Sequence, residues 1–278
     1  GKYFPGVKAL DDVSFDLYPG EVHVIVGENG AGKSTLMKVL SGAYTADAGE
    51  ILLEGKPITR NSPRISEELG IRMIYQELNL VPELSIASNV FLGHELKKGF
   101  FVDKRAQEAK ADELLRDMGI QVDSRTLVKN LGVGTQQMVE IAKAVSMNAK
   151  VVILDEPTSS LTDNEVEALF RIVRDLRDRG VSLIYISHKM AEIREIADDI
   201  TIMRDGVYID TVKSKDVTED DLKRLMVGRE VTGDYYRSDY GEKVSDEVVL
   251  SVKNVSVPGL IHDVSFDLHK GEILGFGG

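Results

Sequence analysis

One segment, Glu21 to Gly42, constrains the fold of this chain more than any other. It starts with the short β-branched apolar run EVHVIV, which predicts a buried strand. The glycine-rich stretch GENGAGKST follows, and the next residues predict a helix with Leu36, Val39 and Leu40 on one side. A strand, a glycine loop and a helix in this order predict an α/β fold that binds a phosphate group at the loop.

The glycine-rich stretch fits the pattern G-x-x-x-x-G-K-[ST], in which Lys33 and Ser34 have defined roles. Gly30 and Gly32 let backbone N–H groups turn inward, and the helix N-terminus adds a partial positive charge. We expect Lys33 to contact the β- and γ-phosphates of a nucleotide and the Ser34 hydroxyl to ligate Mg²⁺. The alternative is a glycine-rich turn that only caps a helix, and the full pattern behind a strand argues against it. The residues expected to bind the nucleotide are Gly27, Glu28, Asn29, Gly30, Ala31, Gly32, Lys33, Ser34 and Thr35.

A second apolar run, at the start of VVILDEPTSSLT, predicts another buried strand that ends in two carboxylates. We expect Asp155 to hold Mg²⁺, directly or through water, and Glu156 to act as a general base or to orient water for attack on the γ-phosphate. Neighbouring strand residues point to opposite faces, but both can reach the nucleotide where the chain turns. The alternative, an acidic pair that caps a helix, is common in loops. The strand before the pair and the phosphate loop upstream favour the site.

A third strand is predicted by SLIYISHK, which ends in His188. A lone histidine at a strand end is more often structural than catalytic. The strand ends of an open α/β sheet, however, converge on the crevice where ligands bind, so we expect His188 to contact the γ-phosphate. Between these strands, a capping box of Thr162 and Glu165 begins a scaffold helix that Gly180 ends.

Composition limits the classes of function that this chain of 278 residues can have. It has no cysteine, which removes disulfide frameworks, thiol nucleophiles and cysteine-ligated zinc. Its formal net charge of −12 argues against general electrostatic binding of nucleic acid. No apolar run approaches the roughly 18 residues of a membrane span, and we expect neither a transmembrane segment nor a secretory leader.

The order of these segments, together with IYQELNLVPELS and LGVGTQQMVEIAKAV, resembles the ATP-binding-cassette ATPases. Four segments are similar in sequence to those of bacterial sugar-import ATPases, including those of the ribose and galactose type: QQMVEIAKA, DEPTSSLT, ISHKMAEI and ITIMRDG. The resemblance implies an α/β P-loop NTPase fold with a mostly parallel RecA-like core, an antiparallel β-subdomain and a helical subdomain. We expect the helical subdomain at about residues 78–150, inside a first cassette of residues 1–227.

The resemblance also implies a role for single residues. Gly27–Thr35 matches the Walker A loop, Asp155 and Glu156 match the Walker B aspartate and catalytic glutamate, and His188 matches the switch histidine. Gln76 matches the Q-loop glutamine, which contacts Mg²⁺ or the lytic water and couples to the permease.

An aromatic residue that stacks on adenine is expected 23 positions before Gly27, at Phe4, with Tyr3 as the second choice. The alternative for both residues is core packing at the start of a strand.

Two motifs depart from the family pattern. The signature, usually LSGGQ, reads LGVGT here, with Gly132 in place of the serine and Thr135 in place of the glutamine. Losing a hydroxyl that contacts a phosphate should weaken that contact, since hydrogen bonds to charged groups contribute about 1.5–3 kcal/mol. Thr162 occupies the position where many members carry the D-loop aspartate, and Asp163 follows it.

The chain contains an internal repeat. Asp12–Leu17 is identical to Asp263–Leu268, and the Gly20–Glu21 pair recurs as Gly271–Glu272. At this constant offset Gly278 aligns with Gly27, the first glycine of the phosphate loop. We therefore expect tandem cassettes: residues 228–247 as a linker and 248–278 as the start of a second cassette.

The sequence thus predicts an ATP-hydrolysing subunit of a bacterial importer for a monosaccharide, with ribose as the first choice and the sugar otherwise open. The expected cofactors are ATP and Mg²⁺. The expected partners are membrane permease subunits, a periplasmic sugar-binding protein and the second cassette, without nucleic acid. We expect a peripheral location on the cytoplasmic face of the inner membrane, and weak activity for the 278-residue chain alone. The alternatives are a cassette ATPase in repair, translation or regulation, and a nucleotide-binding module without hydrolysis.

Overall fold

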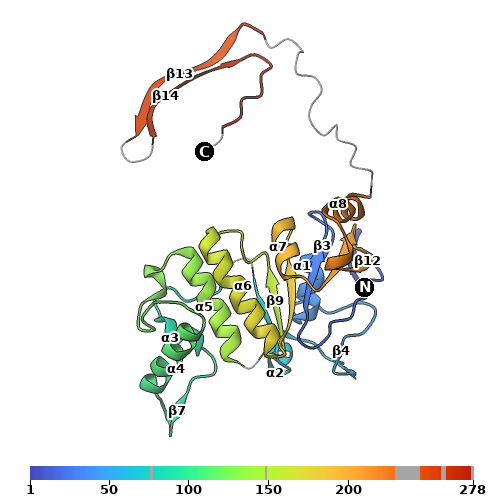
Figure 1. Cartoon of the computed structure of the whole chain (residues 1–278), viewed down its shortest axis with the longest axis vertical. Coiled ribbons are helices and arrows are strands. Elements are labelled where there is room, and N and C mark those ends of the chain that lie inside the picture. Colours follow the sequence, from blue (N-terminus) through green and yellow to red (C-terminus); the bar gives the residue numbers. More distant parts are fainter. Residues whose placement is uncertain (76–77, 148, 229–244, 258–260, 277–278) are drawn as a thin grey trace. The chain divides into compact units, whose positions relative to one another are not determined.

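The computed structural model describes residues 1–75, 78–147, 149–228, 245–257 and 261–276 (Figure 1). The chain divides into two compact units, Gly1–Arg229 and Glu230–Gly278, and each is described by itself. Most of the predicted linker (residues 229–244) and the last repeated glycine, Gly278, lie outside the described residues.

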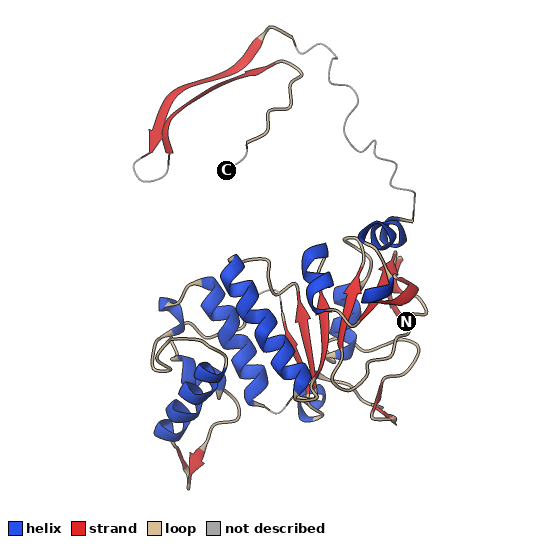
Figure 2. Cartoon of the chain, viewed as in Figure 1, coloured by secondary structure: helices blue, strands red, loops and turns tan. Residues whose placement is uncertain are grey.

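A six-stranded sheet forms the centre of the first unit (Figure 2). Five strands run parallel, and β12 pairs antiparallel with β11 at one edge. In spatial order the strands are β12 (Val207–Lys213), β11 (Asp199–Arg204), β3 (Val22–Val26), β10 (Ser182–Ile186), β9 (Val151–Asp155) and β6 (Ile71–Ile74). The three strands predicted from sequence are therefore the adjacent strands β3, β10 and β9, and the predicted α/β fold with a mostly parallel core is confirmed.

Helices cover both faces of this sheet because alternate strand residues point to opposite faces. On one face, Leu36 and Met37 of α1 (Lys33–Leu40) pack against Ile25 and Ile153. On the other face, residues such as Val24 contact a larger cluster built by four helices. These helices are α5 (Val133–Ser146), α6 (Asp163–Asp178), α7 (Met190–Ile196) and α8 (Glu219–Val227).

The predicted scaffold helix is α6, and its expected start and end are confirmed. The Thr162 backbone N–H donates to Oε2 of Glu165 at 2.9 Å, which completes the capping box. Gly180 follows the helix with a φ of +85°, a conformation that glycine adopts without strain.

Helices α3 (Ile86–Val90) and α4 (Lys104–Asp117) share a third apolar cluster with α5, within the range predicted for a helical subdomain. A short hairpin of β7 (Lys97–Lys98) and β8 (Phe101–Val102) lies between α3 and α4. The other short elements are β1 (Lys2–Phe4), β2 (Val7–Leu10), β4 (Leu52–Leu53), β5 (Lys56–Pro57), α2 (Pro63–Glu68) and two 3₁₀ turns, Val128–Asn130 and Ser214–Asp216. β1 pairs with β2 and β4 with β5 as antiparallel hairpins.

The second unit is an antiparallel hairpin of β13 (Val248–Val257) and β14 (Ile261–His269). Its repeated sequence shares two local features with the first copy, although Asp263–Leu268 lies within β14 whereas Asp12–Leu17 forms no strand. Asp12 and Asp263 both have a positive φ, of 52° and 53°. The Tyr18 N–H donates to Glu21 Oε2 at 2.6 Å, and the His269 N–H donates to Glu272 Oε2 at 2.8 Å. The two copies therefore share the backbone conformation at the aspartate and the turn closed by the glutamate, but not the strand between them.

Candidate nucleotide site

The predicted phosphate loop joins the end of β3 to the start of α1, and two of its glycines are required by close backbone contacts. A Cβ on Gly27 would collide with the carbonyl oxygen of Met203. A Cβ on Gly32, whose φ is +94°, would lie 2.6 Å from the carbonyl oxygen of Ala9. Gly30 also has a positive φ, of 88°, but no atom lies within 4 Å of its added Cβ. Gly27 and Gly32 are thus constrained by packing, whereas Gly30 is constrained only by its backbone conformation.

Lys33 is buried at the base of this loop. Its ammonium donates to the carbonyl oxygens of Gly27 at 2.7 Å and Glu28 at 3.1 Å. Burial lowers the pKa of Lys33, and the nearby carboxylates of Glu156 and Asp155 oppose this shift. The fold therefore brings the lysine, the loop and both predicted acidic residues together.

Asp155 and Glu156 face the same site because the chain turns sharply between them. Asp155 is the last residue of β9, and Glu156 has a φ of +46°, in the left-handed region. The Glu156 N–H donates to the Ile186 carbonyl at 3.1 Å, which ties this turn to β10. Burial and the charge of Glu156 raise the pKa of Asp155, while a hydrogen bond from the Ser34 side chain and the charge of Lys33 oppose that rise.

His188 follows β10 and lies beside Glu156. Its Nδ1 is 3.2 Å from Oε1 of Glu156, so an Nδ1–H tautomer donates to the carboxylate. The histidine side chain is largely exposed, and the glutamate side chain is less so. The two residues predicted to act on the γ-phosphate thus form a direct pair at the carboxyl ends of β9 and β10.

A buried carboxylate behind this pair was missed by sequence reasoning. Glu192 accepts hydrogen bonds from the hydroxyls of Thr158 (2.6 Å), Ser187 (2.9 Å) and Tyr185 (3.0 Å). The Lys189 ammonium lies 3.1 Å from the same carboxylate. Burial acts to raise the pKa of Glu192, but these donors outweigh it and the pKa is lowered.

Thr158 belongs to the loop after Glu156, whereas Ser187 and Lys189 flank His188. Glu192 therefore joins the two loops that carry the predicted catalytic pair. From sequence alone, an acidic residue on a short helix is expected to be exposed to solvent. The one feature of the sequence that could have indicated a role for Glu192 is its spacing of four residues from His188.

Phe4 and Tyr3 both lie on β1, and neither is buried in the core. The Phe4 ring packs edge-on against Tyr44 at a centroid distance of 5.5 Å, and Lys2 Nζ lies 5.3 Å from its centroid. The alternative of core packing for these two aromatics is therefore wrong. Gln76, the remaining predicted site residue, lies outside the described residues.

The departures in the signature and at Thr162 have structural consequences. Gly132 is the N-cap of α5 and offers no side-chain cap. A Cβ on Gly134 would collide with the carboxylate of Glu165, so the start of α5 packs closely against the start of α6. The hydroxyl of Thr162 lies 2.8 Å from Glu165 Oε2 and is thus engaged in the capping box.

Ser34 and Asp155 fit the expected magnesium ion. Mg²⁺ prefers oxygen ligands, and a hydroxyl and a buried carboxylate that hydrogen-bond each other supply two. Among the described residues, the one cluster with metal-ligand geometry is Glu21, His23 and Asp199. His23 bonds Glu21 at 2.8 Å and Thr201 at 2.7 Å, and Lys213 pairs with Asp199 at 2.7 Å. That cluster lies near the amino ends of β3 and β11 and is already hydrogen-bonded, so we assign it no metal.

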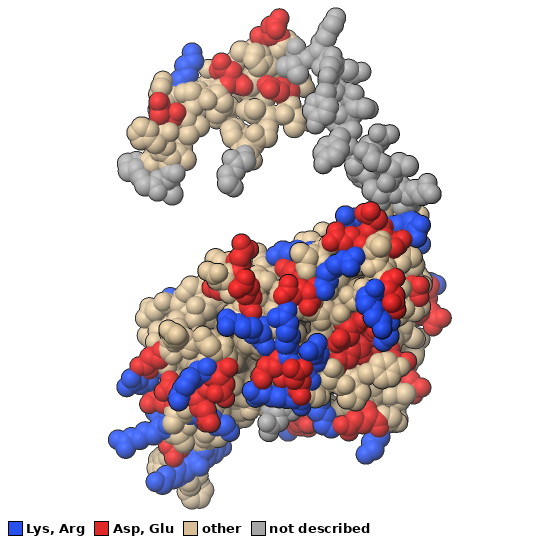
Figure 3. Space-filling model, viewed as in Figure 1, with Lys and Arg blue, Asp and Glu red and all other residues tan. Residues whose placement is uncertain are grey.

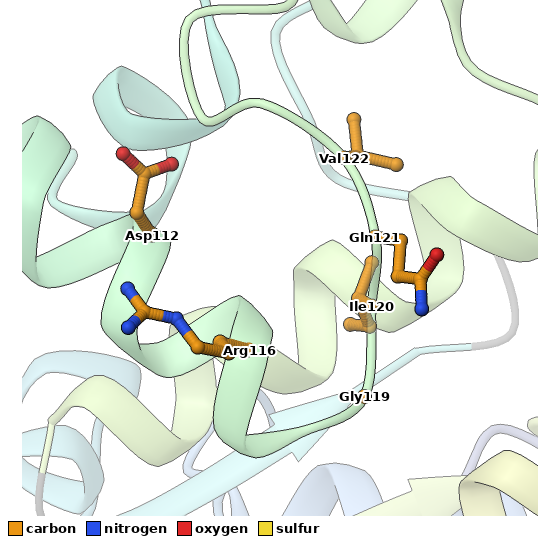
Figure 4. A pocket seen from close by; sticks show the side chains of 6 residues that line it. All are labelled: Asp112, Arg116, Gly119, Ile120, Gln121 and Val122. Atoms are coloured by element: carbon orange, nitrogen blue, oxygen red, sulfur yellow. The ribbon is translucent and has the colours of Figure 1, made fainter.

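Two hollows lie away from the phosphate loop. A groove of about 690 Å³ is lined by residues of β6 and α5, among them Arg72, Glu140 and Lys143. Tyr75, directly before Gln76, also lines this groove. A smaller hollow of the helical subdomain is lined by Asp112 and Arg116 of α4 and by the loop after it (Figure 4). None of the predicted site residues lines the smaller hollow, and we assign it no role.

The described helices include none that is both long and apolar enough to cross a membrane. A family model described as ABC transporter matches residues 10–159. A crystal structure of the ADP conformation of MJ1267, an ATP-binding cassette of an ABC transporter, superposes with a TM-score of 0.71 at 27% identity. The match covers 84% of this chain and 94% of that one.

Curated relatives extend over the whole chain. A putative ribose/galactose/methyl galactoside import ATP-binding protein 2 of Agrobacterium fabrum is 53% identical over 278 residues, which is all of this chain and 54% of that protein. A ribose import ATP-binding protein, RbsA 1, of Streptomyces avermitilis is 50% identical over 277 residues and is covered to 52%. The chain thus spans about half the length of the curated relatives it matches.

Proposed function

The chain belongs to the ABC transporter family, and from that premise we propose that it binds ATP with Mg²⁺ and hydrolyses it to drive the import of a monosaccharide. The observation that carries this proposal is the convergence of Lys33, Asp155 and the Glu156–His188 pair at one edge of the sheet. Ligands of open α/β sheets bind at this edge, outside the carboxyl ends of the strands.

We assign the phosphates to the loop Gly27–Thr35 and to the N-terminus of α1. Two loop carbonyls hold the Lys33 ammonium, and its position beside both carboxylates suits a contact with the β- and γ-phosphates. Phe4 is assigned to the adenine base. Its ring is partly exposed and packs edge-on against Tyr44, and both observations support that assignment.

Ser34 and Asp155 are assigned to Mg²⁺, together with Gln76 from the Q-loop. When bound, the ion neutralises charge that develops on the transferred phosphoryl group. Glu156 is assigned to the attacking water, as a base or as an orienting group, because its carboxylate lies where the chain turns toward Lys33. His188 orients that carboxylate through Nδ1, which leaves its other ring nitrogen for the γ-phosphate.

The site is completed by a second cassette of a longer protein. The repeated turn at Glu272 and the doubled length of the relatives support a first cassette of residues 1–227, a linker of 228–247 and a second cassette from 248. The signature of one half then contacts the nucleotide of the other half. Because Gly132 and Thr135 alter the signature here, we propose one hydrolytic site in the full protein, built on Lys33, Glu156 and His188.

The partners that we propose are permease subunits and, through the assembled transporter, a periplasmic sugar-binding protein. The names of the relatives support a ribose- or galactose-type sugar, whose identity the permease and the binding protein select. The groove beside Tyr75 supports docking of the permease next to Gln76. The chain is then peripheral, on the cytoplasmic face of the inner membrane.

The experiment compares ATP binding and turnover in this chain and in a version extended through a second cassette. We expect both to bind ATP and the extended protein alone to turn it over rapidly, since the partner's donors stabilise the transition state. Glu156→Gln in the extended protein should remove nearly all turnover, whereas Glu167→Gln, an exposed acid of α6, should not.

Substantial turnover with Glu156→Gln would contradict the single-site proposal. ATP binding without turnover in the extended wild type would favour a regulatory module instead of a transport ATPase.

A further inference from the structure

The hairpin of β7 and β8, here called the aromatic hairpin (residues 97–102), presents its largest apolar side chains to solvent. Phe100 is 102% exposed and Phe101 is 81% exposed. Val102 is exposed beside them. Both rings are thus about as accessible to water as in an unfolded chain, and they contribute little burial to the stability of the protein.

The two phenylalanines do not hold the helical subdomain together. Its apolar cluster is made by other residues, such as Val90, Phe91 and Leu115, and Leu96 packs against it. The hairpin is anchored by its base, where the Asp103 N–H donates to the Leu96 carbonyl at 2.8 Å. The tip therefore serves something outside the subdomain.

Four cations lie within five residues of Phe100 in the sequence: Lys97, Lys98, Lys104 and Arg105. None of them forms an ion pair with another of the described residues. Blue side chains border the hairpin region at the lower left of Figure 3.

The acidic residues beside these cations accept hydrogen bonds from backbone N–H groups, and the charge of Lys97 also acts on Glu95. Glu95 accepts from the Gly93 N–H at 3.2 Å, and Asp103 accepts from the Ala106 N–H at 3.0 Å. A locally basic, aromatic tip thus projects from a chain whose formal net charge is −12.

We propose that the aromatic hairpin inserts into the interfacial layer of an anionic lipid bilayer. Phenylalanine beside unpaired lysine is the composition of segments that lie in a membrane interface, where aromatic rings enter the acyl boundary and cations face lipid phosphates. Lysine can extend its ammonium to the headgroups while its stem stays near apolar groups. A protein partner fits less well, because lysine is depleted from protein–protein interfaces.

The inference rests on the hairpin and not on ATP hydrolysis, although a membrane contact agrees with the peripheral location proposed above. Vesicle binding and ATP binding are measured separately, so each can fail without the other. Anionic vesicles should repel the acidic remainder of the chain. Binding to such vesicles therefore requires a local attraction strong enough to overcome this repulsion.

The test is flotation of the 278-residue chain with vesicles of phosphatidylcholine alone or with about a third phosphatidylglycerol. At about 0.1 mM accessible lipid we expect roughly half of the protein to float with anionic vesicles, since a single acyl anchor binds with a constant of about 10⁴ M⁻¹. Binding should fall several-fold without the anionic lipid or at about 1 M salt, where the screening length is roughly 3 Å.

Variants locate the contact. Lys97→Gln with Lys98→Gln should lower the partition constant about thirtyfold, since each lysine near the surface contributes about 1 kcal/mol. Phe100→Ser with Phe101→Ser should separately lower it at least about tenfold, because two apolar rings no longer leave water. The matched controls alter exposed residues elsewhere, Tyr18→Ser with Leu52→Ser and Lys56→Gln with Lys215→Gln, and should bind like wild type.

Unchanged thermal unfolding and ATP binding show that the variants are folded. Absence of vesicle binding by the wild type, equal binding to neutral vesicles, or unaffected binding by the hairpin variants would overturn the proposal. Hairpin-dependent capture of purified permease without vesicle binding would assign the hairpin to a protein contact.

Discussion

The Thr158 hydroxyl donates a 2.6 Å hydrogen bond to the buried carboxylate of Glu192 and so joins the loop after β9 to helix α7. The same carboxylate bonds Ser187 and pairs with Lys189, on either side of His188. The distance between His188 and Glu156 is thus held by a group that touches neither of them. Glu192 is a positioning residue for the proposed site.

Glu192→Gln should therefore slow turnover in the extended protein. The glutamine amide has an NH₂ donor where Glu192 has a second acceptor oxygen. The substitution also removes the buried negative charge that pairs with Lys189. We expect unfolding to become easier by about 1.5–3 kcal/mol, as for hydrogen bonds to charged groups, and kcat to fall with KM for ATP little changed. Steady-state kinetics and denaturant unfolding measure both.

Glu195→Gln is the matched control, because this exposed acid of α7 pairs only with Arg174 in the described part of the chain. It should change neither quantity much, since exposed pairs contribute about 0–1 kcal/mol. A loss of stability with unchanged kcat in Glu192→Gln would reduce Glu192 to a purely structural role.

Asp155→Asn should stabilise the nucleotide-free chain at neutral pH. The pKa of Asp155 is raised in the fold by burial and by Glu156, so the folded chain binds this proton more tightly than the unfolded chain does. The contribution of Asp155 to the free energy of unfolding is therefore greatest at acid pH, where the carboxyl group is protonated. This contribution is lost as the pH rises through the raised pKa. The variant should gain about 1 kcal/mol at pH 7, a usual single-site effect.

This gain should shrink as the pH falls toward the ordinary Asp range. Thermal unfolding across pH 4 to 8 tests the trend. Addition of Mg²⁺ and ATP should stabilise the wild type and not the variant, and a variant that responds like the wild type would remove Asp155 from the metal assignment.

Gly134→Ala should destabilise the chain although it places alanine near the start of a helix. The added methyl group would displace the Glu165 carboxylate and break the capping box of α6. Loss of a cap costs about 1 kcal/mol, and crowding adds to it. Chemical denaturation measures the difference.

Gly132→Ala is its natural comparison, since no atom lies within 4 Å of the added methyl and the φ of Gly132 is −64°. We expect a change below about 0.5 kcal/mol, and Gly132→Ser should be slightly stabilising because serine caps helices. Equal effects of the two alanine variants would show that the contact between α5 and α6 does not contribute to the free energy of unfolding.

Gly27→Ala should be more harmful than Gly30→Ala in the same phosphate loop. Its methyl group would meet the backbone carbonyl of Met203, which cannot rotate away as a side chain does. We expect a cost of about 1–3 kcal/mol and weaker ATP binding. The methyl group of Gly30→Ala meets no other atom within 4 Å. This substitution should destabilise the chain by about 1–2 kcal/mol, because alanine disfavours the left-handed backbone conformation at this position. Thermal unfolding and titration with ATP compare the two, and a milder Gly27→Ala would contradict the packing argument.

Much of the fold was predictable because local signals agreed with the tertiary structure. The apolar runs before Gly27, Glu156 and His188 became β3, β9 and β10, which lie side by side in the centre of the sheet. The capping box of Thr162 and the stop at Gly180 also follow from local rules of helix ends. Burial of a whole strand needs a continuous apolar run, and such runs are visible in sequence.

The sequence by itself therefore determined the α/β fold, the repeat at Asp12 and Asp263, and the choice of Lys33, Asp155, Glu156 and His188, which the fold brings together. Only the tertiary structure decided why Gly27 has no side chain, how Glu156 turns beside Asp155, and that Glu192 joins the two loops of the site. These relations depend on atoms that are distant in sequence, such as the Met203 carbonyl and the Thr158 hydroxyl. Local propensity carries no information about such contacts, because packing sets them once the strands are aligned.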